Sequence, residues 1–197
     1  AEAMAADIEE IDGIIGQFLD FARGENEDKA EHDLDALVLE LGEHYARIHR
    51  SVVVRTSAVP PFRFARLAVR RAVANLVDNA LRYAPPESAV TVSVRPDRER
   101  VELAVVDAGR GIPATERERV FERFHRVAND PTRGSGLGLA ISRAIVQRHD
   151  GTITLADAQP GAPLPGLAVR VSFPVAPTPR ASAPGPLKSA LSFGSAS

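Results

Sequence analysis

The sequence predicts an α/β protein in which a sheet of about five strands carries three helices, with one further helix in front. Three observations predict it. Apolar residues recur at helical spacing in some segments and alternate in others. Apolar residues make up 44% of the 197 residues, which is enough to bury a core. A glycine-rich loop leads into one of the helical segments. We therefore expect one globular domain with appendages.

The first element is a helix over Glu2–Arg23, whose apolar residues form one stripe. Nothing nearby in the sequence covers this stripe, so we expect it to pack on another helix or on a second copy of the chain. The alternative is that it folds back onto its own domain. Residues 25–32 are polar and charged and are predicted to be a linker.

The segments that follow alternate between helix and strand. Helices are predicted over Leu34–Ile48, with Asp33 as N-cap, Arg66–Tyr83 and Leu137–Arg148. Strands are predicted over Ser51–Thr56, Val90–Arg95, Val101–Asp107, Ile153–Ala156 and Leu167–Pro174. Pro60–Pro61 is read as a turn, and residues 96–99 as the turn of a hairpin.

The long loop Ala108–Ser135 is expected to hold a short helix over Thr115–Phe124, and connections of this length often act as lids. Gly151 is expected to end the last helix. The segment after Pro174 is rich in Ala, Pro, Ser and Gly, and we expect it to be disordered.

Composition limits the function classes. The formal net charge of -2 argues against nucleic acid as the main partner. The absence of cysteine excludes disulfides, thiolate catalysis and cysteine-ligated zinc. No apolar run approaches the roughly 20 residues that span a bilayer, and the N-terminus lacks the pattern of a signal peptide. We expect the chain as given to be soluble.

Gly134, Gly136 and Gly138 alternate just before a helix. A loop of this kind leaves N–H groups unpaired at the positive end of the helix dipole, which favours phosphate. By itself the pattern is weak evidence, because many such stretches are flexible turns.

Asn75 and Asn79 lie four residues apart and share one face of the predicted helix. Their amide oxygens could orient a Mg²⁺ ion that takes its other ligands from phosphates and water. Arg82 could contact phosphate, and Tyr83 could stack on a base. The alternative is that these are ordinary surface or core-edge residues.

Asp107 is the last residue of a predicted strand and precedes Gly109 and Gly111. A carboxylate at this position can accept a hydrogen bond from the exocyclic amine of adenine, whereas guanine presents an acceptor there. The glycines would let the backbone approach the ring. The alternative is an aspartate that only shapes an Asx-turn.

Four segments of the chain resemble the N, G1, F and G2 boxes of sensor histidine kinases, in that order. They are Asn75–Asn79, Asp107–Pro113, Phe121–Arg126 and Gly134–Ile141. The resemblance covers about residues 60–174, and residues 71–83 are especially similar to the osmosensor EnvZ.

The resemblance implies a Bergerat-type ATP-binding fold, a two-layer α/β sandwich with a mixed sheet and a mobile lid. It implies that Asn79 holds Mg²⁺ with support from Asn75, that Asp107 reads adenine, and that Phe121 and Phe124 anchor the lid. The residues that it assigns to the nucleotide are Asn75, Asn79, Arg82, Tyr83, Asp107, Gly109, Gly111, Ile112, Arg126, Gly134, Ser135, Gly136, Leu137, Gly138 and Leu139. Asn75, Arg126 and Arg133 are the catalytic candidates, because phosphoryl transfer needs positioning and charge neutralisation. The two arginines could instead be solvated charges of the lid.

One part of the family pattern is missing. None of the five histidines has the acid and later proline that follow the phosphoacceptor histidine. We therefore expect a fragment with residues 1–24 as the second helix of a dimerisation hairpin, residues 33–174 as the kinase domain with lid 108–135, and residues 175–197 as a tail. The fragment would bind ATP and phosphorylate a histidine in trans, but not itself on the usual residue.

The resemblance also implies a setting for the whole protein. This setting is a homodimer at the bacterial inner membrane, with this domain in the cytoplasm and a response regulator downstream.

Three other functions remain open. An ATPase of the same fold would carry a glutamate in place of Asn75 as general base. An anti-sigma-factor serine kinase would share the fold, usually without the leading helix. A binding module would hold nucleotide only for structure and would dimerise through the Glu2–Arg23 stripe.

Overall fold

A mixed five-stranded sheet forms one layer of the domain, in the order β2-β4-β5-β7-β6. The computed structural model describes residues 27–48, 51–127 and 135–175. The strands of the sheet are β2 (Val52–Thr56), β4 (Val90–Asp97), β5 (Arg100–Val106), β6 (Thr152–Asp157) and β7 (Leu167–Pro174). β2 pairs with β4 in parallel, and the other neighbours pair antiparallel. This confirms the predicted α/β class and the five-stranded sheet.

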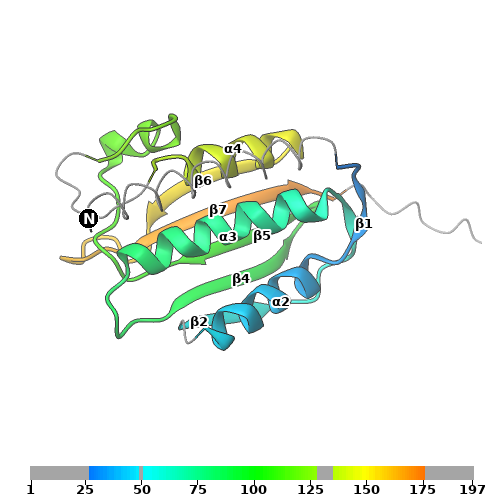
Figure 1. Cartoon of the computed structure of the whole chain (residues 1–197), viewed down its shortest axis with the longest axis horizontal. Helices are drawn as coiled ribbons and strands as arrows, with labels where there is room; N and C mark the ends of the chain where they lie inside the picture. Colours follow the sequence, from blue (N-terminus) through cyan, green and yellow to red (C-terminus); the bar gives the residue numbers. More distant parts are fainter. Residues whose placement is uncertain (1–26, 49–50, 128–134, 176–197) are drawn as a thin grey trace, which may run out of the picture.

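Three helices cover one face of this sheet (Figure 1). They are α2 (Leu34–Arg47), α3 (Arg66–Tyr83) and α4 (Gly138–Arg148). Alternate residues of β4 point into the interface, so Val90, Val92 and Val94 are buried while their neighbours are not. Leu76 and Val77 of α3 are buried against them, and each such side chain contributes roughly 1.5–3 kcal/mol. Asp33 caps α2 as predicted, by accepting a hydrogen bond from the Ala36 N–H at 3.1 Å.

A second, two-stranded sheet lies at one end of the domain (Figure 1). Its strands β1 (Ala30–His32) and β3 (Phe62–Phe64) are antiparallel. β1 falls in the stretch predicted to be a linker, and β3 follows the predicted turn. Both strands escaped prediction because three residues are too few to show a period of two.

The N-terminus of α3 is capped from two distant parts of the chain. Its own N-cap residue, Ala65, has no side chain that can cap it. The Glu27 carboxylate instead accepts hydrogen bonds from the Leu67 and Ala68 N–H groups at 2.9 and 3.0 Å. The Ala65 N–H donates to His149 Nε2 at 3.0 Å. These contacts tie the start of the domain and the end of α4 to the helix that carries Asn75 and Asn79.

His149, the residue after α4, is a buried and neutral imidazole. Nε2 accepts from Ala65, so Nδ1 must carry the proton that it donates to the Ile145 carbonyl at 2.7 Å. Burial lowers the pKa of His149, and the charges of Lys29 and Arg148 lower it further. A positive charge on this ring would therefore destabilise the fold.

The stability of the domain is expected to depend on pH through His149. Its pKa is lower in the folded than in the unfolded state, so the unfolded chain binds more protons below the ordinary pKa of about 6.5. The free energy of unfolding should thus be highest above that pH and should fall by at most about 1.4 kcal/mol per pH unit below it. Urea denaturation between pH 5 and 8 measures this.

Two variants isolate the effect of His149. His149→Gln keeps an acceptor and a donor but does not titrate, and it should flatten the dependence on pH. His44→Gln removes an exposed histidine and should leave the dependence unchanged. If His149→Gln follows the same pH curve as the wild-type chain, the assignment to His149 is wrong.

The end of α4 corrects one detail of the prediction. The left-handed residue after the helix is Asp150, with φ of 55°, and not Gly151. Gly151 is required for a different reason, since a Cβ atom there would lie 2.9 Å from the Ser172 carbonyl oxygen. The glycine thus allows the helix end to lie against β7.

The predicted helix Thr115–Phe124 is also wrong. The segment forms two short 3-10 helices, η1 (Ala114–Glu116) and η2 (Arg119–Phe121). The Glu116 and Phe121 N–H groups bond three residues back, to Pro113 and Glu118. Phe124, with φ of 64°, cannot continue a helix. The predicted helix 2–23 and residues 176–197 of the predicted tail lie outside the described residues.

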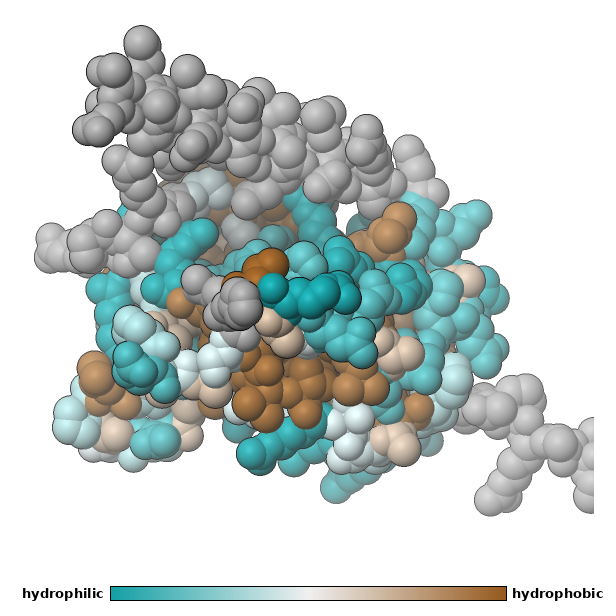
Figure 2. Space-filling model, turned by 60° about the horizontal axis from the view of Figure 1, so that its bottom comes forward, coloured by the Kyte–Doolittle hydropathy of each residue, from teal (hydrophilic) through white to brown (hydrophobic). Residues whose placement is uncertain are grey.

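Among the described residues, the large hydrophobic side chains that are exposed are Leu39, Ile48, Val53, Leu67, Phe124 and Leu164. Figure 2 shows hydrophobic residues gathered in the middle of one face, with hydrophilic residues around them. Among the described residues, the helices are too short or too polar to cross a membrane.

Candidate functional site

Four segments meet at the end of the domain opposite β1: the last turns of α3, the turn after β5, the first turn of α4, and η1 and η2 (Figure 1). One close approach and one ordinary van der Waals contact join these segments. A Cβ atom on Gly109 would lie 2.6 Å from the Tyr83 carbonyl oxygen. A Cβ atom on Gly138 would lie 3.9 Å from Cβ of Asn75. The structure thus brings Gly138 next to Asn75, which lies 63 positions earlier in the sequence.

Asn75 provides a buried polar group without a partner. Its Nδ2 atom is inaccessible to solvent and has no hydrogen bond among the described residues. An unsatisfied buried donor is unfavourable by about 1–3 kcal/mol, so such a group commonly serves a ligand. Asn79 lies one turn further on and is partly buried. Asp78, between them, is turned toward α2, where it accepts a hydrogen bond from the Tyr45 hydroxyl at 2.8 Å.

The first turn of α4 faces Asn75. The N-cap position, Leu137, has no side-chain cap, and the Leu137 N–H makes only a long bond of 3.4 Å to Ser135 Oγ. Gly136 has φ of 67°, and a Cβ atom there would collide with the backbone of Phe124. Among the described residues, no side chain of the N-cap residue caps this helix, so its start presents the positive end of the dipole, which is the arrangement that binds phosphate.

Asp107 lies at the other side of the site, at the end of β5. It is 6% exposed, and its Oδ1 atom accepts hydrogen bonds from the Gly109 and Leu167 N–H groups at 2.7 and 3.3 Å. Burial raises the pKa of this carboxyl group, and the two N–H bonds partly offset that rise. Among the described residues, the Oδ2 atom accepts no hydrogen bond.

Other predicted residues have different surroundings. Arg82 and Arg126 are exposed. The ring of Tyr83 is covered on one face by the Arg110 guanidinium, 5.3 Å from the ring centre. Leu137 is the N-cap residue of α4, Gly138 and Leu139 begin its first turn, and all three are partly buried.

Two further predictions can be compared with the structure. Phe121 is buried, as expected of a lid anchor, but Phe124 is 67% exposed and does not anchor the lid. Arg133 and Gly134 lie outside the described residues.

Sequence reasoning missed Arg117 and Asp157. Arg117 Nε donates to the Ile112 carbonyl at 3.0 Å, and its Nη2 pairs with Asp157 Oδ1 at 2.6 Å. Gly166 was also missed, and its N–H donates to the Gly109 carbonyl at 2.9 Å. No local pattern could have revealed these contacts, because each joins residues at least 40 positions apart or lies within an irregular turn.

The donor set around Asn75 suits a magnesium ion carried by phosphates. The described residues contain no group of three or more His, Cys, Asp or Glu side chains that could hold a metal by themselves. Two amides can supply only part of a coordination sphere, and Mg²⁺ typically takes the rest from substrate phosphates and water. The residues present therefore fit Mg²⁺ together with a polyphosphate.

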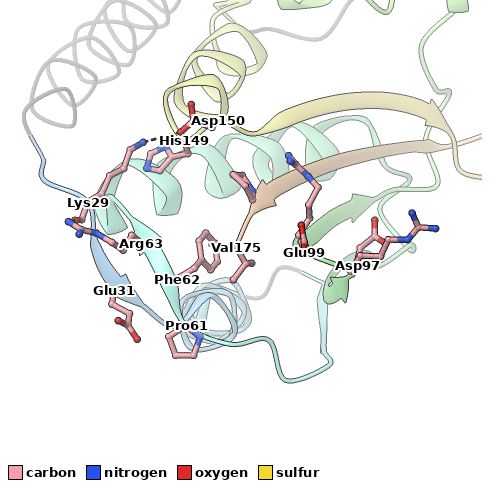
Figure 3. A pocket seen from close by; sticks show the side chains of 13 residues that line it. Lys29, Glu31, Pro61, Phe62, Arg63, Asp97, Glu99, His149, Asp150 and Val175 are labelled. Atoms are coloured by element: carbon pink, nitrogen blue, oxygen red, sulfur yellow. Dashed lines mark hydrogen bonds and ion pairs between the residues drawn. The ribbon is translucent and has the colours of Figure 1, made fainter. Parts of the chain in front are cut away.

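A cavity of about 1410 Å³ lies at the opposite end of the helices. Figure 3 shows it between the β1–β3 sheet, the end of α4 and the β4–β5 turn, with Val175 among the residues that line it. Lys29 and Asp150 form an ion pair of 3.8 Å at its rim. Acidic and basic side chains are mixed around it, so it has no evident preference for one charge.

Comparison with known proteins places these features in a family. Residues 65–177, more than half of the chain, match the family described as histidine kinase-, DNA gyrase B- and HSP90-like ATPase. The signal transduction histidine-protein kinase/phosphatase MprB of Mycolicibacterium vanbaalenii is 36% identical over 182 residues. That match covers 90% of this chain and 38% of MprB, so the chain spans little more than a third of this relative.

Solved structures agree with this placement. A mycobacterial sensor histidine kinase MprB structure is 33% identical, with a TM-score of 0.67, and the match covers 76% of this chain and 99% of that one. The histidine kinase domain of the E. coli osmosensor EnvZ is 31% identical, with a TM-score of 0.57 over 77% of this chain and 90% of that one. The chain therefore belongs to the family of histidine kinase-, DNA gyrase B- and HSP90-like ATPases, and within it to the ATP-binding domains of sensor histidine kinases.

Proposed function

We propose that this chain binds Mg²⁺-ATP and transfers the γ-phosphoryl group to a histidine on a separate dimerisation domain. One observation carries the proposal: the Nδ2 atom of Asn75, which is buried and has no hydrogen-bond partner among the described residues, lies beside the N-terminus of α4, where Leu137 provides no side-chain cap. The Asn75 amide and the N-terminus of α4 thus lie together, and both favour a ligand that accepts many hydrogen bonds and carries negative charge. A triphosphate meets both requirements.

Each end of the nucleotide has a counterpart in the site. Asp107 Oδ2 would accept a hydrogen bond from the adenine amine, while Gly109 and Gly111 let the main chain approach the ring. Asn79 and Asn75 would ligate Mg²⁺, which neutralises charge on the phosphates when bound. Arg126 and Arg133 would contribute further positive charge from the lid.

Transfer is favoured over hydrolysis by the chemistry of α3. Hydrolysis needs a general base beside the phosphates, and an asparagine cannot accept a proton. Asp78, the carboxylate nearest in sequence to Asn75 and Asn79, is held by Tyr45 on the side of α2. Water is therefore not activated by these residues, and the phosphoryl group is kept for a better nucleophile.

The partners are inferred from the named relatives, which are signal transduction histidine-protein kinases. We infer that the chain works within a longer protein that forms a homodimer and carries the phosphoacceptor histidine, supplied in cis or in trans. A response regulator would receive the phosphoryl group next. The domain would lie in the cytoplasm of a bacterium, beneath a sensor in the inner membrane.

Transfer in trans tests the proposal. The chain is incubated with ATP labelled at the γ-phosphate, Mg²⁺ and the histidine-bearing dimerisation domain of an MprB relative. We expect label on the partner that is stable to base and labile to acid, and none on this chain. The same sample without partner should release phosphate no faster than background.

Each rival function gives a different result in this assay. Rapid phosphate release without a partner would favour an ATPase, and label stable to acid on a serine protein would favour a serine kinase. Binding of ATP without any transfer would leave only a nucleotide-binding module, and the proposed reaction would be wrong.

A further inference from the structure

Arg117 connects two segments on either side of the adenine end of the site. It lies between η1 and η2, and its guanidinium bonds both the Ile112 carbonyl and the Asp157 carboxylate. The side chains of Arg117 and Asp157 are 23% and 31% exposed, so their ion pair is largely shielded from water. Charge-assisted bonds in such surroundings are stronger than those on an open surface.

The same two segments are joined a second time through Asp107. Asp157 is the register partner of Leu167 across β6 and β7. The Leu167 N–H donates to Asp107 Oδ1, and the Asp107 N–H donates to the Leu167 carbonyl at 3.0 Å. A closed ring of contacts thus joins Asp107, the turn Gly109–Pro113, Arg117, Asp157 and Leu167.

A third contact fixes the middle of this ring. The Gly166 N–H donates to the Gly109 carbonyl at 2.9 Å. A Cβ atom on Gly111 would lie 2.9 Å from Pro165, so the turn lies directly against the β6–β7 connection. Without Arg117, the Gly109–Pro113 turn would be held at its start but not at its far side.

We propose that Arg117 and Asp157 are positioning residues that set the adenine preference of the site. They hold the Gly109–Pro113 turn against the end of β6, so that Asp107 Oδ2 and the turn backbone meet the adenine ring together. The proposal rests on the proposed ATP-binding function. Neither side chain need touch the nucleotide, because a turn ordered in advance binds more tightly than one that must be ordered on binding.

The test compares the affinities for ATP and GTP in variants of Arg117 and Asp157, and in Asp107→Asn, by calorimetry with non-hydrolysable analogues and Mg²⁺. Arg117→Met keeps the length of the side chain but removes its donors, and it should weaken ATP about tenfold with little effect on GTP. Asp157→Asn should also weaken the binding of ATP, but by less. Arg117→Lys should give a loss of ATP affinity between that of the wild-type chain and that of Arg117→Met. Arg119→Met is the control, because among the described residues Arg119 pairs with Glu116 alone, within the same short segment.

The outcomes separate this inference from the proposed function. Loss of the ATP preference in Arg117→Met and Asp157→Asn, at temperatures where both are folded by circular dichroism, supports the positioning role. A lower melting temperature with an unchanged ratio of ATP to GTP affinity would overturn it. If Asp107→Asn weakens the binding of ATP while Arg117→Met and Asp157→Asn bind it normally, only this inference is wrong. If none of these three substitutions changes the affinity for ATP, the proposed adenine site itself is wrong.

Discussion

Replacing Asp107 with asparagine is expected to weaken ATP binding by about 10- to 100-fold without destabilising the domain. Asparagine can keep the two hydrogen bonds that Oδ1 accepts from Gly109 and Leu167. It would, however, turn an N–H₂ group toward the amine of adenine, where two donors oppose each other. A hydrogen bond to a charged group contributes about 1.5–3 kcal/mol, which sets the size of the loss.

The same substitution should leave the stability of the nucleotide-free domain unchanged or raise it, although it weakens the binding of ATP. Burial raises the pKa of Asp107 in the folded state, so the ionised form is disfavoured there relative to the unfolded chain. This penalty is absent below the ordinary pKa of about 3.9 and develops as the pH rises through the folded-state pKa. Asparagine avoids it, and Asp107→Asn should melt at the same or a higher temperature than the wild-type chain at pH 7.

Calorimetric titration with an ATP analogue and Mg²⁺, together with thermal melts, measures both effects. Asp97→Asn removes an exposed carboxylate at the far end of β4 and is the control, with neither property changed. The wild-type affinity for ATP should also fall as the pH is lowered through the raised pKa of Asp107. Unchanged affinity in Asp107→Asn would show that this carboxylate does not contact the base.

Long elements could be predicted from the sequence because their periodicity extends over several turns or pairs. The helix Arg66–Tyr83 and the strand Leu167–Pro174 have the predicted bounds. The lid segment 115–124 shows where this reasoning fails. It is rich in residues that favour helix, yet the bond from Arg117 to Ile112 and the left-handed Phe124 impose tight turns instead.

The site could be predicted in part, because its polar residues sit in short local motifs. The motifs located Asn75 and Asp107, but no motif shows that Asn75 lacks a hydrogen-bond partner or that Asp107 is buried. The supporting contacts are long-range. His149 reaches Ala65 across 84 residues and Arg117 reaches Asp157 across 40, and a single sequence contains no signal for either pair.

Replacing Asn75 with alanine is expected to reduce phosphoryl transfer about a hundredfold while leaving the nucleotide-free domain as stable as before. The loss follows because a preorganised donor next to a transferring phosphoryl group typically contributes two to three orders of magnitude in rate. The unchanged stability follows from the unpartnered Nδ2 atom, since removing a buried donor without a hydrogen bond offsets the small cavity left behind.

These two effects of Asn75→Ala together distinguish a ligand-binding amide from a structural one. A structural amide would be hydrogen-bonded, and its loss would lower the melting temperature of the free domain. Transfer is measured to the histidine-bearing partner at saturating ATP and Mg²⁺, and melting without nucleotide. Asp78→Asn is the matched control on the same helix, because Asp78 faces Tyr45 and should affect transfer little. Normal transfer by Asn75→Ala would remove the observation on which the proposed function depends.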